Sequence, residues 1–285
     1  MLQKFFKYHG AGTDFLLADN RDGLLSLSTA QISHLCDRHT GFGSDGLMLL
    51  ERSESKDFRM VFFNPDGSSG MMCGNGGRCI VAFAAALGVV SGNFPVEFEA
   101  PDGPHTAVIL SEAKDLRRGE AGDIPSTIRL KMADVRGIEY IPELGACFLD
   151  TGTRHLVKFV DSLHSMDVAS EGRALRYDSR FAPQGTNVNF VQVAGRELHV
   201  RTFEKGVEAE TLACGTGVVA SAVAASVRGV AGEVPEGGGL KYSVRTALAM
   251  MEIEFRSSGE GGTFMASDVW LTGPAAFVGT IECLL

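Results

Sequence analysis

The sequence predicts an α+β protein of two pseudo-symmetric lobes, in each of which a curved, mostly antiparallel sheet wraps around a central buried helix. The first reason is an internal repeat, because Cys-Gly-x-Gly occurs at Cys73 and again at Cys214, about half the chain length apart. Each copy leads into an alanine-rich stretch without a polar face, and a helix that is apolar all round must be enclosed on every side. Short strand patterns fill much of the remaining sequence and supply the enclosing sheets.

The composition indicates an ordinary globular chain. Of its 285 residues, 45% are hydrophobic and 21% are charged, which argues against disorder and predicts about two domains. The formal net charge is -9 and no lysine- or arginine-rich run occurs, so we expect no nucleic-acid partner. The longest strongly apolar run, Cys79–Val90, is too short to span a bilayer, and no secretory signal is visible. Six cysteines are too few for a disulfide scaffold, so we expect free thiols in a reducing cytoplasm.

The local patterns of the first half predict two helices and three strands. In chain order these are a surface helix at Gln31–His39, a strand at Val61–Asn64, a helix at Cys79–Leu87, and strands at Val96–Glu99 and His105–Leu110 on either side of the turn Pro101–Pro104. A charged loop, Ser111–Ser126, is the expected boundary between the lobes.

This boundary gives an N-terminal lobe of residues 1–126, which carries Cys73, and a C-terminal lobe of residues 127–274, which carries Cys214. Residues 275–285 read as a strand that returns to the first lobe. The second half contains strand patterns at Phe148–Asp150, Leu156–Val160, Val188–Val193, His199–Glu204 and Met251–Phe255, and a helix pattern at Val218–Val227.

The two repeated cysteines carry the chemistry. A cysteine at the start of a helix lies where unpaired backbone N–H groups and the helix dipole favour negative charge, which lowers the pKa of a thiol. The Gly-Asn-Gly after Cys73 and the Gly-Thr-Gly after Cys214 expose amides that can form an anion-binding nest. A single cysteine of this kind is more often buried and inert, but two in matched contexts indicate two activated thiols, each beside an anion cradle.

Two thiols that face each other across a cleft suit the inversion of a stereocentre. One thiolate removes a proton from a carbon atom, and the other thiol returns a proton to the opposite face. Amino-acid epimerisation has this requirement when no pyridoxal cofactor serves as electron sink. We therefore expect no cofactor and no metal, provided that hydrogen-bond donors stabilise the charge on the carboxylate.

Six motifs, in this order along nearly the whole chain, make the sequence resemble the diaminopimelate epimerase family. They are His9-Gly10-Ala11-Gly12-Thr13-Asp14-Phe15, Asn64-Pro65-Asp66-Gly67 with Met72-Cys73-Gly74-Asn75-Gly76, Gly152-Thr153-Arg154-His155, Gly185-Thr186-Asn187-Val188-Asn189-Phe190, Phe203-Glu204-Lys205-Gly206, and Glu210-Thr211-Leu212-Ala213-Cys214-Gly215-Thr216-Gly217. The resemblance implies a cofactor-independent isomerase that converts LL- to meso-diaminopimelate for lysine and peptidoglycan synthesis. It is also compatible with a homodimer, although the sequence does not fix the oligomeric state.

The resemblance also implies a role for each site residue. Cys73 and Cys214 would be the acid/base thiols. The backbone amides of Gly74, Asn75, Gly215 and Thr216 would cradle the α-carboxylate. The groups that grip the substrate's amino and distal ends would be Thr13, Asn64, Thr153, Asn187, Glu204 and Lys205, whereas Asn189 would shape the loop. On the residues alone, Asn64 and Asn187 can equally be turn residues, and His155 reads as a structural turn residue, with a place near the cleft as the alternative.

Three positions depart from the family pattern. Thr13 and Thr153 stand where the family usually has Asn, and Lys205 replaces an Arg, losing the bidentate fork that matches a carboxylate. Because all three changes fall where the distal end of the substrate or its neighbours would be recognised, the reaction type is better defined by the sequence than the substrate. An epimerase for a different amino acid is therefore one alternative.

Other classes of protein remain as alternatives. Cys73 and Cys214 could form a reversible disulfide in a thiol redox protein, or the chain could bind an amino acid without turning it over. The related isomerases of phenazine biosynthesis share the fold but lack the paired thiols. Gly41–Gly46 spells G-x-G-x-x-G but follows a helix-like run and precedes a strand-like one, so we interpret it as a turn and not as a nucleotide site. No cysteine or histidine pairs have zinc-ligand spacing.

Overall fold

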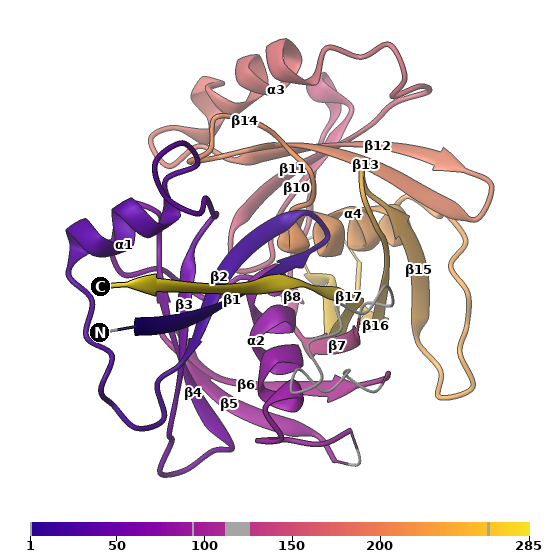
Figure 1. The fold of residues 1–285 in the computed structure, drawn as a ribbon. Helices are drawn as coiled ribbons and strands as arrows, with labels where there is room; N and C mark the ends of the chain where they lie inside the picture. Colours follow the sequence, from indigo (N-terminus) through magenta and orange to yellow (C-terminus); the bar gives the residue numbers. More distant parts are fainter. Residues whose placement is uncertain (1, 93, 112–125, 261–262) are drawn as a thin grey trace. The chain divides into compact units, whose positions relative to one another are not determined.

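The computed structural model describes residues 2–92, 94–111, 126–260 and 263–285, and it shows a mixed α/β protein of two compact units (Figure 1). The first unit comprises Met1–Leu130 with Gly273–Leu285, and the second comprises Lys131–Thr272. The expected boundary loop, Ser111–Ser126, falls almost entirely outside the described residues.

The first unit is a mixed sheet with two helices. Its strands are β1 (Leu2–Gly10), β2 (Thr13–Asp19), β3 (Leu47–Glu51), β4 (Phe58–Phe63), β5 (Val96–Ala100), β6 (Gly103–Ile109) and β7 (Ser126–Lys131), together with the end of β17 (Met265–Leu284). The predicted strands at Val61–Asn64, Val96–Glu99 and His105–Leu110 correspond to β4, β5 and β6. β1 and β2, which are not among the predicted strands, pair as a hairpin.

Helix α1 spans Thr29–Cys36, so the predicted helix at Gln31–His39 is displaced toward the N-terminus. It begins there because Ser28 and Gln31 form a capping box, in which each side chain accepts a hydrogen bond from the other residue's backbone N–H. Helix α2 spans Gly74–Ala86 and is buried along almost its whole length. The prediction at Cys79–Leu87 found its apolar body and missed its glycine-rich first turn.

The second unit has the same ingredients. Its strands are β8 (Val135–Arg136), β9 (Glu139–Ile141), β10 (Ala146–Asp150), β11 (Arg154–Phe159), β12 (Asn187–Ala194), β13 (Glu197–Glu204), β14 (Ala209–Thr211), β15 (Leu240–Arg245), β16 (Met250–Ser258) and the start of β17. Its helices are α3 (Val168–Arg176), α4 (Gly215–Val227) and the short 3₁₀ turns η2 (Pro142–Leu144) and η3 (Ser179–Phe181). Like α2, α4 is buried along most of its length, as its lack of a polar face predicts.

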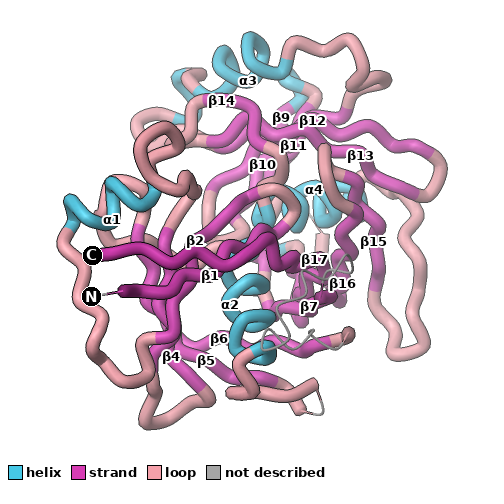
Figure 2. Tube along the Cα trace, in the orientation of Figure 1, coloured by secondary structure: helices cyan, strands magenta, loops and turns pink. Residues whose placement is uncertain are grey.

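The two units repeat one order of elements and pairings (Figure 2). In the first, the hairpins β1–β2, β3–β4 and β5–β6 are joined by the parallel pairs β2–β3 and β4–β5, with α1 and α2 in the two crossovers. In the second, the hairpins β10–β11, β12–β13 and β15–β16 are joined by the parallel pairs β11–β12 and β13–β15, with α3 and α4 in the crossovers. The helices that follow the two repeated cysteines thus occupy equivalent places.

The last strand, β17, belongs to both units. Its first part pairs with β16 and β8 of the second unit, and its end pairs antiparallel with β1, from Leu2 opposite Leu284 to His9 opposite Ala276. Within the described part of the chain, no helix combines the length and apolarity needed to cross a membrane.

Candidate active site

Cys73 occupies the N-cap position of α2. The strand β4 and the loop after it deliver Cys73 with an extended backbone, and its sulfur accepts a hydrogen bond of 3.3 Å from the backbone N–H of Gly76. The side chain is partly exposed. The thiol therefore lies where the unpaired N–H groups of a helix start favour a negative charge.

The residues that follow Cys73 are held from both sides. The Asn75 side chain donates a hydrogen bond to Thr13 Oγ1 at 2.8 Å, and it accepts one from Arg78 Nη2 at 2.8 Å. Gly10 of β1 lies so close to Asn75 that a Cβ atom added to Gly10 would be 2.8 Å from the Asn75 carbonyl oxygen. The structure thus places Thr13 beside Gly74 and Asn75, the residues assigned to the carboxylate cradle, whereas the resemblance groups it with the residues at the other ends of the substrate.

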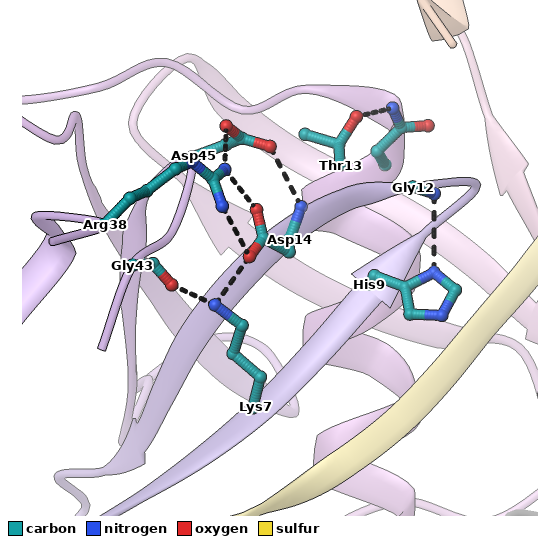
Figure 3. Close-up of polar contacts among 9 residues, drawn as sticks. Lys7, His9, Gly12, Thr13, Asp14, Arg38, Gly43 and Asp45 are labelled. Atoms are coloured by element: carbon teal, nitrogen blue, oxygen red, sulfur yellow. Dashed lines mark hydrogen bonds and ion pairs between the residues drawn. The ribbon is translucent and has the colours of Figure 1, made fainter. Parts of the chain in front are cut away.

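A charged cluster holds the strand that carries Thr13. Asp14, the next residue of β2, is paired with Lys7 at 2.5 Å and with Arg38 at 2.7 Å, and its backbone N–H donates to Asp45 (Figure 3). Although burial alone raises the pKa of Asp14, hydrogen bonds from Arg38 and Lys7 lower it to about 2. Asp14 is therefore charged at neutral pH, and its ion pairs with Lys7 and Arg38 fix the start of β2.

Asn64 is engaged in its own turn after β4. Its side-chain N–H groups donate to Ser68 Oγ at 3.0 Å and to the Ser69 carbonyl oxygen at 3.3 Å. These contacts match the turn alternative, and no hydrogen bond found among the described residues joins Asn64 to the Cys73 group.

Cys214 occupies the N-cap position of α4, the equivalent place in the second unit. Its side chain is buried, and Sγ lies 3.5 Å from Thr216 Oγ1. Thr153 Oγ1 lies 3.3 Å from the same hydroxyl, and Thr151 donates to the Thr216 carbonyl oxygen. As Thr13 contacts Asn75 in the first unit, Thr153 contacts the second residue after the cysteine here.

His155 corrects a sequence-based prediction, because it lies in strand β11 and not in a turn. The ring is fully buried, with Nε2 at 2.9 Å from Thr153 Oγ1 and at 3.0 Å from Thr216 Oγ1. Nδ1 faces the side-chain nitrogen of Asn189 at 3.0 Å, and Asn189 Oδ1 accepts from Thr202. Since an amide N–H can only donate, Nδ1 is the acceptor and the ring proton resides on Nε2. Burial, with a smaller contribution from Lys205, lowers the pKa of His155 to about 3.

The remaining predicted residues adjoin this group. Asn187 donates to the Arg154 carbonyl oxygen at 3.1 Å and accepts from the backbone N–H of Lys205 at 2.8 Å. Glu204, the last residue of β13, accepts from Thr211 Oγ1 at 2.9 Å. The second unit thus assembles Thr153, Asn187, Lys205, Thr216 and Cys214 through consecutive contacts. Over the residues that the structure describes, no cluster of three or more potential metal ligands occurs.

Comparison with known proteins decides the family. The sequence model for diaminopimelate epimerase matches residues 5–121 and 147–271. Proteins named diaminopimelate epimerase from Flavobacterium psychrophilum and Chlorobaculum tepidum are each 39% identical to this chain, over 96% and 95% of it and 98% of their own lengths. The chain belongs to the diaminopimelate epimerase family. The predicted resemblance and the predicted isomerase class are thereby confirmed.

Solved structures share the fold of this family member at low sequence identity. A phenazine biosynthesis protein of the PhzF family from Bacillus anthracis matches with a TM-score of 0.72 at 13% identity, with both chains covered completely. A hydroxyproline epimerase from Agrobacterium vitis matches with a TM-score of 0.68 at 14% identity, over 99% of this chain and 91% of that one.

Two buried polar residues of this epimerase-family chain were missed as site residues. His155 follows a Gly-Thr turn signal that masked the strand after it, and Arg78 lies inside an otherwise apolar helix body, where an arginine is unusual. A charged residue directly before Cys79–Leu87, a stretch predicted to be enclosed on every side, is the signal that could have revealed Arg78.

Proposed function

We propose that the chain inverts the α-carbon of LL-diaminopimelate to give meso-diaminopimelate, with Cys73 and Cys214 as the two acid/base thiols. The observation that carries the proposal is the equivalent placement of the two sulfurs. Each belongs to the N-cap residue of a buried helix, and the two helices occupy the same position in the repeated order of elements. We interpret the two units as the pseudo-symmetric lobes of such an enzyme, in which each buried helix is the centre of its own sheet.

The first turns of α2 and α4 supply the anion cradle. We place the α-carboxylate at the backbone amides of Gly74 and Asn75 and of Gly215 and Thr216, because helix N-termini bind anions through unpaired N–H groups. The helix dipole favours a negative charge there by roughly 0.3–1 kcal/mol at exposed sites, and by more where water is excluded.

The chemical step then balances without any further reactant. One thiolate takes the α-proton, and the electron pair of the C–H bond moves into the carboxylate as an enolate-like charge. Cradle donors stabilise this charge more strongly than that of the ground-state carboxylate, which is what accelerates the reaction. The second thiol donates its proton to the opposite face of the carbon and becomes a thiolate, so the enzyme ends with the same net charge.

The other site residues fix the substrate. Thr13 and Thr153 contact the second cradle residue of their own units, so we place both beside the α-carboxylate and not at the distal end. Asn187, Glu204 and Lys205 form a continuous group that we assign to the distal amino-acid end, and we assign Asn64 to the amino end. Because Lys205 keeps a positive charge, it can still pair with a distal carboxylate. A cytoplasmic location and a homodimer stay predictions.

The test uses the purified chain with LL-diaminopimelate in D₂O under reducing conditions. We expect meso-diaminopimelate to form with solvent deuterium at the α-carbon, without consumption of reductant. Cys73→Ser and Cys214→Ser should each lower full epimerisation about 10²- to 10⁴-fold, the usual contribution of an acid/base group.

Cys283→Ser is the control, because this partly exposed cysteine lies outside both cradles and should keep wild-type turnover. Wild-type turnover in either of the other two serine variants contradicts the two-thiol mechanism. Turnover of another amino acid with none of diaminopimelate would overturn the substrate, and consumption of reductant would indicate a redox protein.

A further inference from the structure

Arg78 is a fully buried arginine in the helix that begins at Cys73. Its guanidinium group donates to the Gly74 carbonyl oxygen at 3.0 Å, to Asn75 Oδ1 at 2.8 Å and to the Pro274 carbonyl oxygen at 3.2 Å. Two of these three acceptors belong to the residues assigned to the carboxylate cradle. The side chain therefore lies directly behind the first turn of α2 and fixes its shape.

All three acceptors of Arg78 are neutral. Among the residues that the structure describes, no carboxylate pairs with this guanidinium, and burial lowers the pKa of Arg78 to about 10. A buried charge without a counter-charge is costly, and arginine cannot readily relieve that cost by losing its proton. The fold therefore retains a positive charge that an anion arriving nearby would stabilise.

Two cysteines flank this group of contacts: Cys73 directly precedes Gly74 and Asn75, which Arg78 binds, and Cys79 directly follows Arg78. Negative charge on either thiol raises the pKa of Arg78. Electrostatic coupling is mutual, so the guanidinium favours a thiolate at either position. Complete burial raises the pKa of Cys79 far above its usual range and keeps that thiol protonated. Cys73 is partly exposed and its sulfur accepts a backbone N–H hydrogen bond from Gly76, so of the two thiols it is the better placed to carry a negative charge.

Within the described residues, the strands that pack against α2 do not supply a competing counter-ion. The strands packed against α2 bring the titratable side chains Lys4, Lys7, Tyr8 and His9 from β1, Asp14 and Asp19 from β2, Glu51 from β3, and His105 from β6. The three carboxylates of this set each pair with a lysine or arginine other than Arg78. Burial raises the pKa of Tyr8 and keeps it neutral.

In the second unit a neutral residue stands at the position equivalent to Arg78. Val219, fully buried, stands at the same place after Cys214 as Arg78 does after Cys73. The two helices that follow the repeated cysteines are therefore alike in backbone, but only the one after Cys73 carries a buried cation in its first turns.

We propose that Arg78 is a positioning residue that holds the Cys73 cradle in shape and supplies the positive charge that keeps Cys73 as a thiolate in the substrate-free protein. The inference rests on the proposed function for its catalytic meaning. According to this proposal, the Arg78 guanidinium attracts two anions, the Cys73 thiolate and the substrate's carboxylate. In the substrate-free protein the thiolate is then in the first unit.

The experiment measures the rate of iodoacetamide alkylation of each cysteine against pH, with labelled peptides resolved by mass spectrometry. In Arg78→Met the pH at half-maximal alkylation of Cys73 should rise by about one unit or more, the usual effect of losing a nearby opposite charge. Arg78→Lys, which keeps the charge without the fork, should restore most of the wild-type profile. The Cys214 profile of the same samples is the internal control and should not move.

A Cys73 profile in Arg78→Met that superimposes on the wild type overturns the proposal, as does an equal shift at Cys214, which would indicate a general loss of structure. Should Arg78→Met fail to fold, the wild-type protein still decides: Cys73 must be half-alkylated at a pH below that of a free thiol, about 8.5, and a higher value contradicts the assignment. Because alkylation needs no substrate, its outcome is independent of whether diaminopimelate turns over.

Discussion

The site owes its shape to buried polar side chains with defined donor and acceptor roles, of which His155 is the clearest. Asn189 donates to one ring nitrogen, and the hydroxyls of Thr153 and Thr216 face the other, so one neutral tautomer satisfies every partner. Protonation of Nδ1 would turn its hydrogen bond with Asn189 into a clash of two donors. Burial, which lowers the pKa of His155 to about 3, and this hydrogen-bond geometry therefore both favour the neutral ring.

His155 should make the second unit sensitive to acid. Between pH 6.5 and about 3 the unfolded chain binds a proton at His155 that the folded chain does not. The free energy of unfolding must therefore fall as the pH falls through this window, with a slope of up to one proton, whereas above pH 6.5 the residue contributes no slope. In His155→Gln this part of the pH dependence should disappear.

Urea unfolding followed by fluorescence measures the effect, because the single tryptophan, Trp270, lies in the same unit as His155. The comparison is the difference in slope between the wild type and His155→Gln across the window, since every other titrating group is common to both. Equal slopes would mean that His155 is charged in the folded protein, and the assigned tautomer would then be wrong.

Single residues also show which parts of the site can be predicted from the sequence and which cannot. Cys73 and Cys214 are predictable because each is followed by glycines and a helix, a local pattern that carries its own chemistry. His155 and Arg78 are not, since their roles depend on Asn189, Thr216 and Pro274, which are distant in sequence. A turn signal at Gly152 and the usual exposure of arginine point away from the structure that forms.

At the scale of elements, local side-chain interactions override intrinsic propensity at the start of α2. Gly74, Gly76 and Gly77 are poor helix formers, so propensity predicts a helix that starts later, near Cys79. In the structure the helix begins at Gly74, because Cys73 caps it and Arg78 holds the Gly74 carbonyl oxygen. The apolar bodies of both buried helices could be predicted, whereas their exact starts at Gly74 and Gly215 could not.

The close approach of β1 to this turn gives a prediction. Gly10→Ala should lower kcat/KM for diaminopimelate at least tenfold, because the new Cβ would meet the Asn75 carbonyl oxygen at 2.8 Å and its Cα at 3.1 Å. The contact is with backbone, so the cradle itself must move. Overpacking of this kind costs about 1–3 kcal/mol, more than the roughly 0.5–1 kcal/mol that alanine gains over glycine within a strand.

Gly279→Ala is the matched control, because Gly279 lies in β17 of the same unit and its Cβ would meet no atom within 4 Å. Steady-state kinetics and thermal melting of the two variants should separate sharply. Wild-type kinetics in Gly10→Ala would show that the first turn of α2 tolerates displacement. This result would contradict the proposed role of its backbone amides in binding the carboxylate.

At the scale of the whole molecule, the two units repeat one order of hairpins and crossover helices. The arrangement of either unit therefore predicts that of the other. The Cys-Gly-x-Gly repeat indicates two similar halves, and the same hairpins joined by parallel pairs recur in both units. The parallel pairings themselves have no local sequence signal, because they join strands separated by a helix. The path of β17, which begins in one unit and ends in the other, is likewise set by long-range pairing.

That path predicts an unequal response to truncation. Deleting residues 276–285 removes the strand that pairs with β1 and two side chains, Ile281 and Cys283, that pack on the core beneath α1. The pairings of β12 and β13 in the second unit involve none of these residues. Amide hydrogen exchange should therefore show loss of protection in β1, with protection in β12 and β13 retained, since exchange reports local opening free energies.

Deletion of Leu285 alone, which lies after the end of β17, should leave both regions as in the wild type. Equal loss of protection in both units on the longer deletion would show that they unfold as one cooperative body, whereas full protection in β1 would mean that β2 alone suffices to hold it.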